Sequence, residues 1–368
     1  MVNFESLFEG IYKDKKVLLT GHTGFKGTWL ALWLEQMGAK VYGFSLENVD
    51  ENNHLRLLNL GIEEKIDDIR NAGVLQKYFE EVQPDIVFHL AAQALVRQSY
   101  NDPIETFSTN VMGSLNVYEA CRKTASVKAI VNVTSDKCYE NKEWEWGYRE
   151  NDPMGGYDPY SASKGCSELL TSSYRNSYFN TKDFGNKHQV LLASGRAGNV
   201  IGGGDWAADR LIPDIVKATS INEAVLIRNP KATRPWQHVL EPLSGYLTLG
   251  WKLLKKDVSV ADGWNFGPDN HSNLQVGDIV KLSHECWNSI QVEISKNTDE
   301  HHEANLLMLD CSKANKLLKW QAVWGIDKTI DKTISWYKEY YENNKILSLT
   351  DLTEYVSDAK TANILWAL

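Results

Sequence analysis

The stretch TGHTGFKG, from Thr20 to Gly27, repeats glycine at every third position directly after a short apolar run. That run, KVLLT (Lys16–Thr20), predicts a buried strand, and the apolar spacing over Lys26–Met37 predicts a helix. Glycines between a strand and a helix let the backbone approach a pyrophosphate, and free N–H groups at the helix start attract its charge. The stretch therefore predicts a dinucleotide-binding turn, against the alternative of a purely structural turn. The cofactor-binding residues that we predict in it are Gly21, Thr23, Gly24, Phe25, Lys26 and Gly27.

Similar patterns continue along the first half of the chain. Further apolar runs predict strands, and three- to four-residue apolar spacings predict helices between them. Almost wholly apolar strands that alternate with helices are typical of a parallel sheet covered on both faces. We therefore expect an α/β fold with a Rossmann-type doubly wound parallel sheet. The further strands are KVYGF (Lys40–Phe44), DIVFHL (Asp85–Leu90), AIVNV (Ala129–Val133) and QVLLAS (Gln189–Ser194), and the helices are Ile104–Cys121 and Tyr160–Tyr174.

From about Asn199 the pattern is less regular, with shorter apolar runs and more Gly, Pro and Trp. Two amphipathic stretches, near Gln275–Ser289 and Ile326–Asn344, predict late helices. We expect residues 1–198 to form the nucleotide-binding domain. Residues 199–368 would form a smaller, mixed α/β substrate-binding region, interleaved with the first.

Composition excludes several kinds of partner. The net charge of −9 over 368 residues argues against nucleic acid, which would require a basic face. No apolar run is long enough to span a bilayer, and the N-terminus has no signal-peptide core. Five dispersed cysteines are typical of reduced thiols in the cytoplasm. The pair His301–His302 lies in the polar stretch DEHHEAN, and a metal site would need more ligands at helical or loop spacing, so none is expected.

Two more stretches favour a nucleotide cofactor. The end of the second strand reads YGFSLEN, where Ser45 stands in the place at which an acid often binds the adenosine ribose. Neither an acid nor an arginine is present there, so the choice between NAD and NADP stays open. After the next short strand, Asp68 and Ile69 are candidate adenine contacts. The turn LAAQ after the fourth strand contains small residues, which would let a flat cofactor approach the backbone. The cofactor-binding residues that we predict in this turn are Leu90, Ala91, Ala92 and Gln93.

The stretch YDPYSASK predicts a helix that carries a base. Asp158 would cap the helix, and Pro159 would occupy its first position. Tyr160 and Lys164, four residues apart, would then share one face. An ammonium beside a phenol lowers the phenol pKa, which would make Tyr160 a base. The alternative is an exposed tyrosine next to a surface lysine.

The stretch VTSDKCY follows the strand AIVNV and places Asp136 beside Lys137. Ser135 precedes them, so a hydroxyl, an acid and a base meet at one strand end. The alternative is a surface ion pair, which the buried strand disfavours. The sequence leaves open which of the two charged residues gives a proton and which takes one.

The stretches GHTGFKG, HLAAQ, TSDKCY and YSASK, in this order, resemble the extended short-chain dehydrogenases/reductases. Within that family, GNVIGGGDWA and DRLIPD are similar to the sugar-nucleotide 4,6-dehydratases, over roughly residues 10 to 345. The resemblance implies NAD as cofactor, with Thr109 also in its site and Lys164 holding the nicotinamide ribose. It implies Ser135, Asp136, Lys137, Tyr160 and Lys164 as catalytic residues, and a homodimer or homotetramer. The substrate-binding residues that it implies are Asn199, Arg210 and Arg234, the last on the pyrophosphate.

Most of these dehydratases carry Asp then Glu where this chain has Asp136 and Lys137, and the Asp–Lys pair resembles the CDP-glucose branch. The reaction implied is conversion of CDP-D-glucose to CDP-4-keto-6-deoxy-D-glucose and water. C4 is oxidised by NAD, water leaves across C5–C6, and the hydride returns to C6. Either Asp136 is the acid and Lys137 the base, or the reverse. Alternative functions are a sugar-nucleotide 4-epimerase and a non-catalytic NAD-binding protein.

Overall fold

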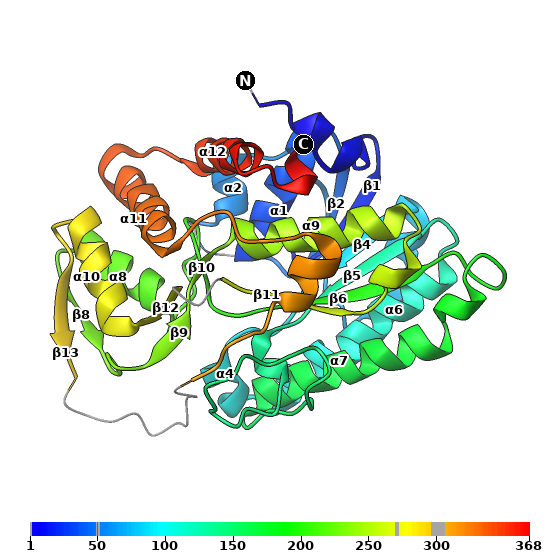
Figure 1. The fold of residues 1–368 in the computed structure, drawn as a ribbon, viewed down its shortest axis with the longest axis horizontal. Coiled ribbons are helices and arrows are strands. Elements are labelled where there is room, and N and C mark those ends of the chain that lie inside the picture. Colours follow the sequence, from blue (N-terminus) through cyan, green and yellow to red (C-terminus); the bar gives the residue numbers. More distant parts are fainter. Residues whose placement is uncertain (1, 49, 51, 269–271, 296–305) are drawn as a thin grey trace.

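A computed structural model describes residues 2–48, 50, 52–268, 272–295 and 306–368 (Figure 1). Within them, a seven-stranded sheet has the order β11-β6-β5-β4-β1-β2-β3, and every neighbouring pair is parallel. The chain moves from β1 toward one edge and from β4 toward the other, which creates a switch point between them. The strands are β1 (Lys16–Thr20), β2 (Lys40–Ser45), β3 (Glu63–Ile66), β4 (Ile86–His89), β5 (Ala129–Val133), β6 (Leu191–Ala197) and β11 (Gly263–Phe266).

Helices cover both faces of this sheet, as Figure 1 shows. On one face, α1 (Phe25–Gln36) and α9 (Leu240–Leu254) bury leucine and tryptophan side chains against the strands, and α12 (Ser348–Thr361) joins that core. The other core is formed with α3 (Ala72–Val82), α6 (Ser114–Lys123) and α7 (Pro159–Ser177). Burial of these apolar faces supplies the main driving force for the layers. The predicted doubly wound α/β fold is confirmed.

The predicted helix over Ile104–Cys121 consists of three successive pieces. They are α5 (Pro103–Phe107), a π-helical segment η2 (Ser108–Gly113) and α6. The apolar spacing is compatible with an ordinary α-helix, so the sequence does not indicate the π-helical segment. Such turns are frequent at functional sites.

The second half of the chain contributes more to the sheet than its pattern indicates. Helix α9 packs on the sheet and β11 forms its edge, although neither was predicted. Both are buried on nearly all sides, and polar residues such as Glu241 and Asn265 are buried with the apolar ones, so the sequence shows no clear periodicity there. The division at residues 198 and 199 stays a prediction. The late helices α10 (Val276–Cys286) and α11 (Ile326–Asn343) confirm the two predicted ones.

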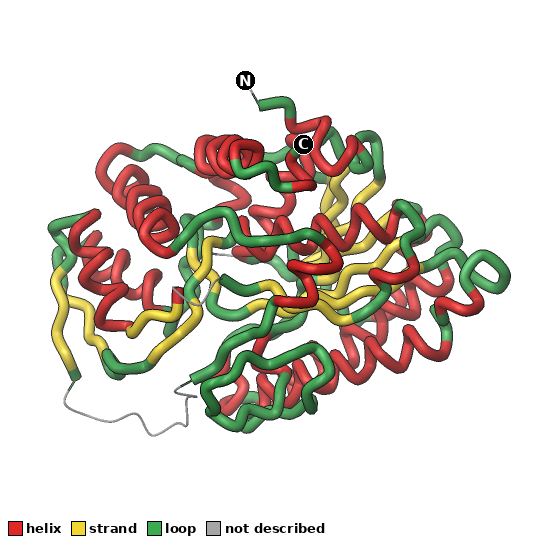
Figure 2. The backbone as a smooth tube through the Cα atoms, in the orientation of Figure 1, coloured by secondary structure: helices red, strands yellow, loops and turns green. Residues whose placement is uncertain are grey.

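A separate apolar core gathers α10, α11 and α8 (Leu211–Ser220) beside short paired strands (Figure 2). The pairs are β8 (Ala224–Ile227) with β13 (Gln291–Ile294), β9 (Thr233–Pro235) with β12 (Asn273–Gln275), and β7 (Val200–Ile201) with β10 (Gln237–His238). The remaining short helices are η1 (Phe4–Gly10), α2 (His54–Leu58), α4 (Val96–Asn101), η3 (Asp136–Cys138), η4 (Thr181–Asp183), η5 (Val258–Val260), η7 (Ala314–Leu318) and η8 (Leu365–Ala367).

None of the helices in the described ranges has the length and hydropathy needed to cross a bilayer. The five cysteines are all free thiols.

Candidate active site

The glycine turn lies at the switch point, where β1 and β4 end. Gly21 has φ +77°, and a β-carbon there would lie 2.7 Å from the backbone nitrogen of Ala91. A β-carbon at Gly27 would lie 2.1 Å from the carbonyl oxygen of Gly21. Only glycine therefore fits at either position. Gly24 is the N-cap residue of α1, and no side chain accepts a hydrogen bond from the first N–H groups of this helix. These N–H groups therefore suit an anionic ligand.

The turn after β4 is tied to two helices. The backbone N–H of Gln93 donates to Asn110 Oδ1 at 2.8 Å, and Asn110 Nδ2 donates to the Gln93 carbonyl at 2.9 Å. The same amide also reaches the Ser163 hydroxyl on α7, at 2.8 Å. The predicted cofactor residue Thr109 precedes Asn110 in the π-helical segment η2. This segment therefore connects the turn at Leu90–Gln93 to the helix that carries Tyr160.

The end of β2 meets the residues after β3. The Ser45 hydroxyl shares a 2.8 Å hydrogen bond with Thr23, and its carbonyl accepts the Asp67 N–H at 2.9 Å. Asp68 follows, and its carboxylate accepts from the Arg70 guanidinium at 2.6 Å. That contact lowers the pKa of Asp68, so the residue is ionised at neutral pH. A carboxylate, absent from β2 itself, therefore comes from the segment that follows the neighbouring strand β3.

Ser135, Asp136 and Lys137 follow β5 at the carboxyl end of the sheet. The Ser135 hydroxyl caps η3, accepting the Lys137 N–H at 3.2 Å, and donates to Asp136 Oδ1 at 3.0 Å. Asp136 is 3% exposed, whereas Lys137 is half-buried. Burial raises the pKa of Asp136, although Lys137 and Ser135 oppose the change. Loss of hydration thus makes Asp136 hold a proton more strongly than an exposed aspartate does.

Tyr160 and Lys164 lie one turn apart near the start of α7. Asp158 caps this helix as predicted, with Oδ1 accepting the Ser161 N–H at 2.9 Å. Tyr160 and Lys164 are both buried, at 8% and 6% exposed. Burial raises the pKa of Tyr160 to about 12, opposed by hydrogen bonding with Ser135 and by the charge of Arg210. The sequence predicts a lowered pKa for Tyr160 because Lys164 lies on the same helix face. The net shift of this pKa is upward, so the prediction is wrong, because desolvation of the phenol is the larger effect.

Two lysines in the site, Lys26 and Lys164, have lowered pKa values. Burial lowers the pKa of Lys164 to about 8, and the negative charge of Glu168 opposes this. Burial also lowers the pKa of Lys26 to about 8, reinforced by Arg210 and opposed by Asp136. The glycine turn that holds Lys26 is thus brought beside the predicted acid, a neighbourhood that sequence spacing does not indicate.

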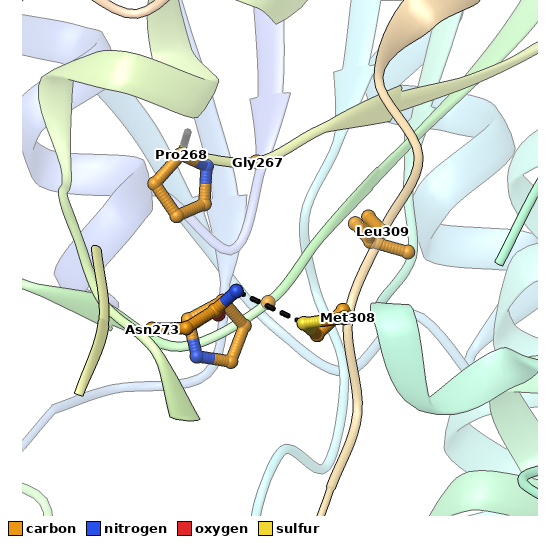
Figure 3. A pocket seen from close by; sticks show the side chains of 7 residues that line it. Gly267, Pro268, Asn273, Met308 and Leu309 are labelled. Carbon is orange, nitrogen blue, oxygen red and sulfur yellow. Dashed lines mark hydrogen bonds between the residues drawn. The ribbon is translucent and has the colours of Figure 1, made fainter. Parts of the chain in front are cut away.

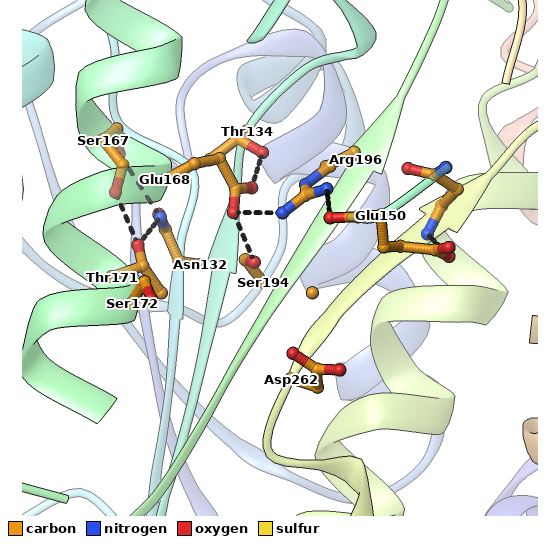
Figure 4. Close-up of polar contacts among 12 residues, drawn as sticks. Asn132, Thr134, Glu150, Ser167, Glu168, Thr171, Ser172, Ser194, Arg196 and Asp262 are labelled. Carbon is orange, nitrogen blue, oxygen red and sulfur yellow. Dashed lines mark hydrogen bonds and ion pairs between the residues drawn. The ribbon is translucent and has the colours of Figure 1, made fainter. Parts of the chain in front are cut away.

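A buried ion pair between Glu168 and Arg196 lies next to the end of β5 (Figure 4). Glu168 accepts from Arg196 Nη2 and Ser194 Oγ, both at 2.8 Å, and from Thr134 Oγ1 at 2.5 Å. Arg196 also donates to the Tyr139 hydroxyl at 2.6 Å. This network joins α7, β5 and β6 around the catalytic strand end. Sequence reasoning missed it, although Glu168 lies one helical turn beyond Lys164.

Two of the predicted substrate residues, Asn199 and Arg234, adjoin in sequence residues that line a small pocket (Figure 3). Gly198 and Pro235 line the pocket. Asn199 follows Gly198 in the chain, and Arg234 precedes Pro235. Arg210 donates to Asp205 at 2.7 Å and acts electrostatically on Tyr160. Arg234 Nη1 donates to the Thr233 carbonyl at 3.0 Å, and its role on the pyrophosphate stays a prediction. The pocket is lined by Gly198, Pro235, Gly267, Pro268, Asn273, Met308 and Leu309, with Asn273 Nδ2 2.9 Å from Met308 Sδ.

His301 and His302 lie outside the described residues. Within those residues, no group of three or more His, Cys, Asp or Glu side chains could hold a metal ion.

Comparisons with known proteins identify the family and the fold. A family model described as GDP-mannose 4,6 dehydratase matches residues 18–333. CDP-glucose 4,6-dehydratase of Salmonella typhimurium is 48% identical over 353 residues, covering 95% of this chain and 98% of that protein. A solved epimerase of Methanothermobacter thermautotrophicus has a TM-score of 0.77 at 23% identity, covering 90% and 94% of the two chains. dTDP-glucose 4,6-dehydratase of Bacillus anthracis, crystallised with NAD, has a TM-score of 0.73 at 20% identity, covering 89% and 98%. The two solved structures establish the fold alone.

Proposed function

The chain belongs to the GDP-mannose 4,6-dehydratase family, and we propose that it is an NAD-dependent hydro-lyase that acts on CDP-glucose. The reaction removes water from CDP-D-glucose and gives CDP-4-keto-6-deoxy-D-glucose. The relative at 48% identity is named for that substrate. The observation that carries the proposal is the buried acid Asp136 beside Lys137, in the same site as Tyr160.

The residues at the switch point fit NAD. Gly21 and Gly27 leave no room for a β-carbon, and α1 has no side-chain cap. When bound, NAD accepts a hydride from C4 of the sugar and returns it to C6, so no net oxidation results. The residues proposed to hold it are Gly21, Thr23, Gly24, Phe25, Lys26, Gly27, Asp68, Ile69, Leu90, Ala91, Ala92, Gln93, Thr109, Tyr160 and Lys164.

We propose NAD over NADP because of Asp68. Its carboxylate is ionised, with its pKa lowered by Arg70, and it follows the strand that pairs with the end of β2. A 2′-phosphate near this carboxylate would be repelled, whereas a ribose hydroxyl could donate a hydrogen bond to it. Arg70 is engaged by Asp68 through Nε and Nη2.

Tyr160 is the proposed base for the O4 proton. Because burial raises its pKa to about 12, the phenol requires nearby positive charge to release its own proton. Arg210 supplies part of that charge, and Lys164 lies one turn along the same helix. The Ser135 hydroxyl, which bonds with Tyr160, would hold the O4 atom in line with the phenol.

Asp136 is the proposed acid for the departing O6, and Lys137 is the proposed base for the C5 proton. The new ketone at C4 acidifies the C5 proton, so its removal and the loss of O6 can follow at one strand end. Burial keeps Asp136 protonated more readily than in water, which favours this assignment over the reverse. Lys137 must then be uncharged when it acts.

A 4-epimerase on the same fold would need Tyr160 and Lys164 but no acid for O6. Turnover of CDP-, dTDP-, GDP- and UDP-glucose would separate the functions, because 4-keto-6-deoxy products absorb in alkali. We expect the keto product from CDP-glucose, at a rate at least tenfold above the other three. A product inverted at C4, or preference for another nucleotide, would contradict the proposal.

Self-association is proposed through α5, η2 and α7. Ile104 and Phe107, which belong to the predicted apolar helix face, are exposed in the single chain at 81% and 37%, and Met112 beside them in sequence is 51% exposed. Leu169 on α7 is 61% exposed. Because α5 and η2 both contact α7, these exposed apolar side chains are candidates for an interaction site. A homodimer or homotetramer would bury it.

The product would supply deoxysugars for a surface polysaccharide such as the O-antigen of lipopolysaccharide. A cytoplasmic location is proposed because the five thiols are free and reduced thiols persist in that compartment. Loss of the deoxysugar from polysaccharide after deletion of the gene would test this role.

A further inference from the structure

Tyr246 is fully buried on α9, and its hydroxyl has no hydrogen-bond partner within the part of the chain that the structure describes. Its ring lies against β6, since a β-carbon at Gly195 would approach two of its ring carbons to 2.7 Å. Gly195 is opposite Val133, the last residue of β5, and its carbonyl accepts the Thr134 N–H at 2.9 Å. Tyr246 therefore packs against the strand end that leads directly into Asp136.

The surroundings of the ring belong to the active site. Lys26 Nζ lies 5.9 Å from the ring centroid. Besides burial, negative charge on Asp136 and on Tyr160 raises the pKa of Tyr246. Asp136 and Tyr160 are the proposed acid for O6 and the proposed base for O4. The Gly195 and Lys26 contacts place the ring beside the strand end that carries Asp136, and the electrostatic effects of Asp136 and Tyr160 agree with that place.

An unpaired buried hydroxyl opposes folding, because it has lost hydration without gaining a hydrogen bond. Other buried tyrosines on this side of the sheet do not share this property. Tyr12 donates to the Leu247 carbonyl at 2.5 Å, and Tyr355 donates to Glu241 at 2.7 Å. The Tyr246 ring packs edge-on against Phe266 at 5.8 Å. A phenylalanine would keep that contact and remove the unpaired hydroxyl.

We propose that the Tyr246 hydroxyl is a further active-site group, which hydrogen-bonds the hexose on its C4–C6 edge. The inference rests on the proposed function, since it takes Tyr160 and Asp136 as the groups that serve O4 and O6. The ligand is the hexose of a nucleoside diphosphate sugar, whose oxygen atoms can satisfy a buried phenol. The hydroxyl would hold that edge of the ring between base and acid.

The test compares Tyr246→Phe with Tyr12→Phe and the wild-type protein. In Tyr246→Phe we expect an unchanged or higher Tm, because no hydrogen bond of the folded chain is lost. Binding of CDP, which lacks the hexose, and NAD content should be unchanged. Turnover of CDP-glucose should fall about tenfold or more, the loss expected for one hydrogen bond made near the reacting atoms. In Tyr12→Phe the Tm should fall and turnover should be retained.

Each other outcome overturns the inference. A Tm that falls in Tyr246→Phe as in Tyr12→Phe would show that the hydroxyl has a partner in the fold. Turnover within twofold of wild type would exclude a role in the reaction. Weaker binding of CDP or NAD would place the contact away from the hexose. If the wild-type protein released no 4-keto product from CDP-glucose, the proposed function would fail and the inference with it.

Discussion

A β-carbon at Gly198 would lie 2.8 Å from Asp136 Oδ2, so the proposed acid rests directly against a glycine that follows β6. The same β-carbon would lie 3.3 Å from Pro235 Cγ. Gly198 therefore lies between the carboxylate and Pro235, which lines the pocket of Figure 3. This contact depends on the absence of a side chain at residue 198 and not on unusual backbone angles.

Gly198→Ala should displace the Asp136 carboxylate and slow dehydration by at least about tenfold, since small displacements of a catalytic group are costly. NAD content should remain as in wild type, because the glycine turn is not touched. The measurement is release of 4-keto-6-deoxy product together with bound NAD. Gly73→Ala on α3 is the matched control, since its nearest neighbour would be 4.0 Å away. Equal rates for both variants would contradict the role of this contact.

Asp136→Asn and Lys137→Met should separate the acid from the base. With the 4-keto intermediate formed in D₂O, deuterium entry at C5 reports proton removal alone. We expect Asp136→Asn to exchange C5 without losing O6, and Lys137→Met to lose the exchange. Exchange that survives in Lys137→Met and disappears in Asp136→Asn would reverse the two roles.

Glu168→Gln should destabilise the protein by about 3 to 5 kcal/mol, because it leaves the buried Arg196 charge without its partner. Glu168→Leu combined with Arg196→Met should recover much of that loss, since an apolar pair removes both buried charges. Urea denaturation measures both variants. A loss below about 1 kcal/mol in Glu168→Gln would be typical of an exposed pair and would exclude the structural role.

Glu241 gives a prediction for pH. It is fully buried, accepts the N–H groups of Val323 and Trp324, and burial raises its pKa from 4.5 to about 7. A raised pKa means that the folded state binds the proton more tightly. The stabilisation is therefore complete below pH 4.5 and is lost as the pH rises through about 7.

Relative to Glu241→Gln, the wild-type protein should lose up to about 3 kcal/mol of unfolding free energy between pH 5 and pH 8. Denaturation of both proteins at the two pH values measures the difference. A difference that does not change with pH would show that Glu241 keeps one protonation state throughout.

Ile104→Glu and Leu169→Glu should weaken self-association, because each places a charge on the exposed apolar surface of α5 or α7. Sedimentation velocity should show a smaller species for both variants. Ile221→Glu, at an equally exposed residue just after α8, is the control and should keep the wild-type size. A wild-type size for all three would exclude this surface as the interface.

The sequence by itself determined the sheet-forming half of the fold and the order of the reactive groups. Strands β1 and β5 have the predicted bounds, and Asp158 caps the predicted helix, because apolar runs, glycine spacing and helix caps are local properties. The Ser135–Lys137 stretch and the Tyr160–Lys164 pair could be placed at strand and helix ends for the same reason.

Only the tertiary structure decided what surrounds those groups. It brought Lys26, Gly198 and Tyr246, which are far apart in the chain, beside Asp136. It also raised the pKa of Tyr160 where the helical pair alone predicts a lower one. Desolvation depends on every atom that excludes water from a group, and those atoms come from distant segments. The spacing of residues along a helix or strand carries no information about them.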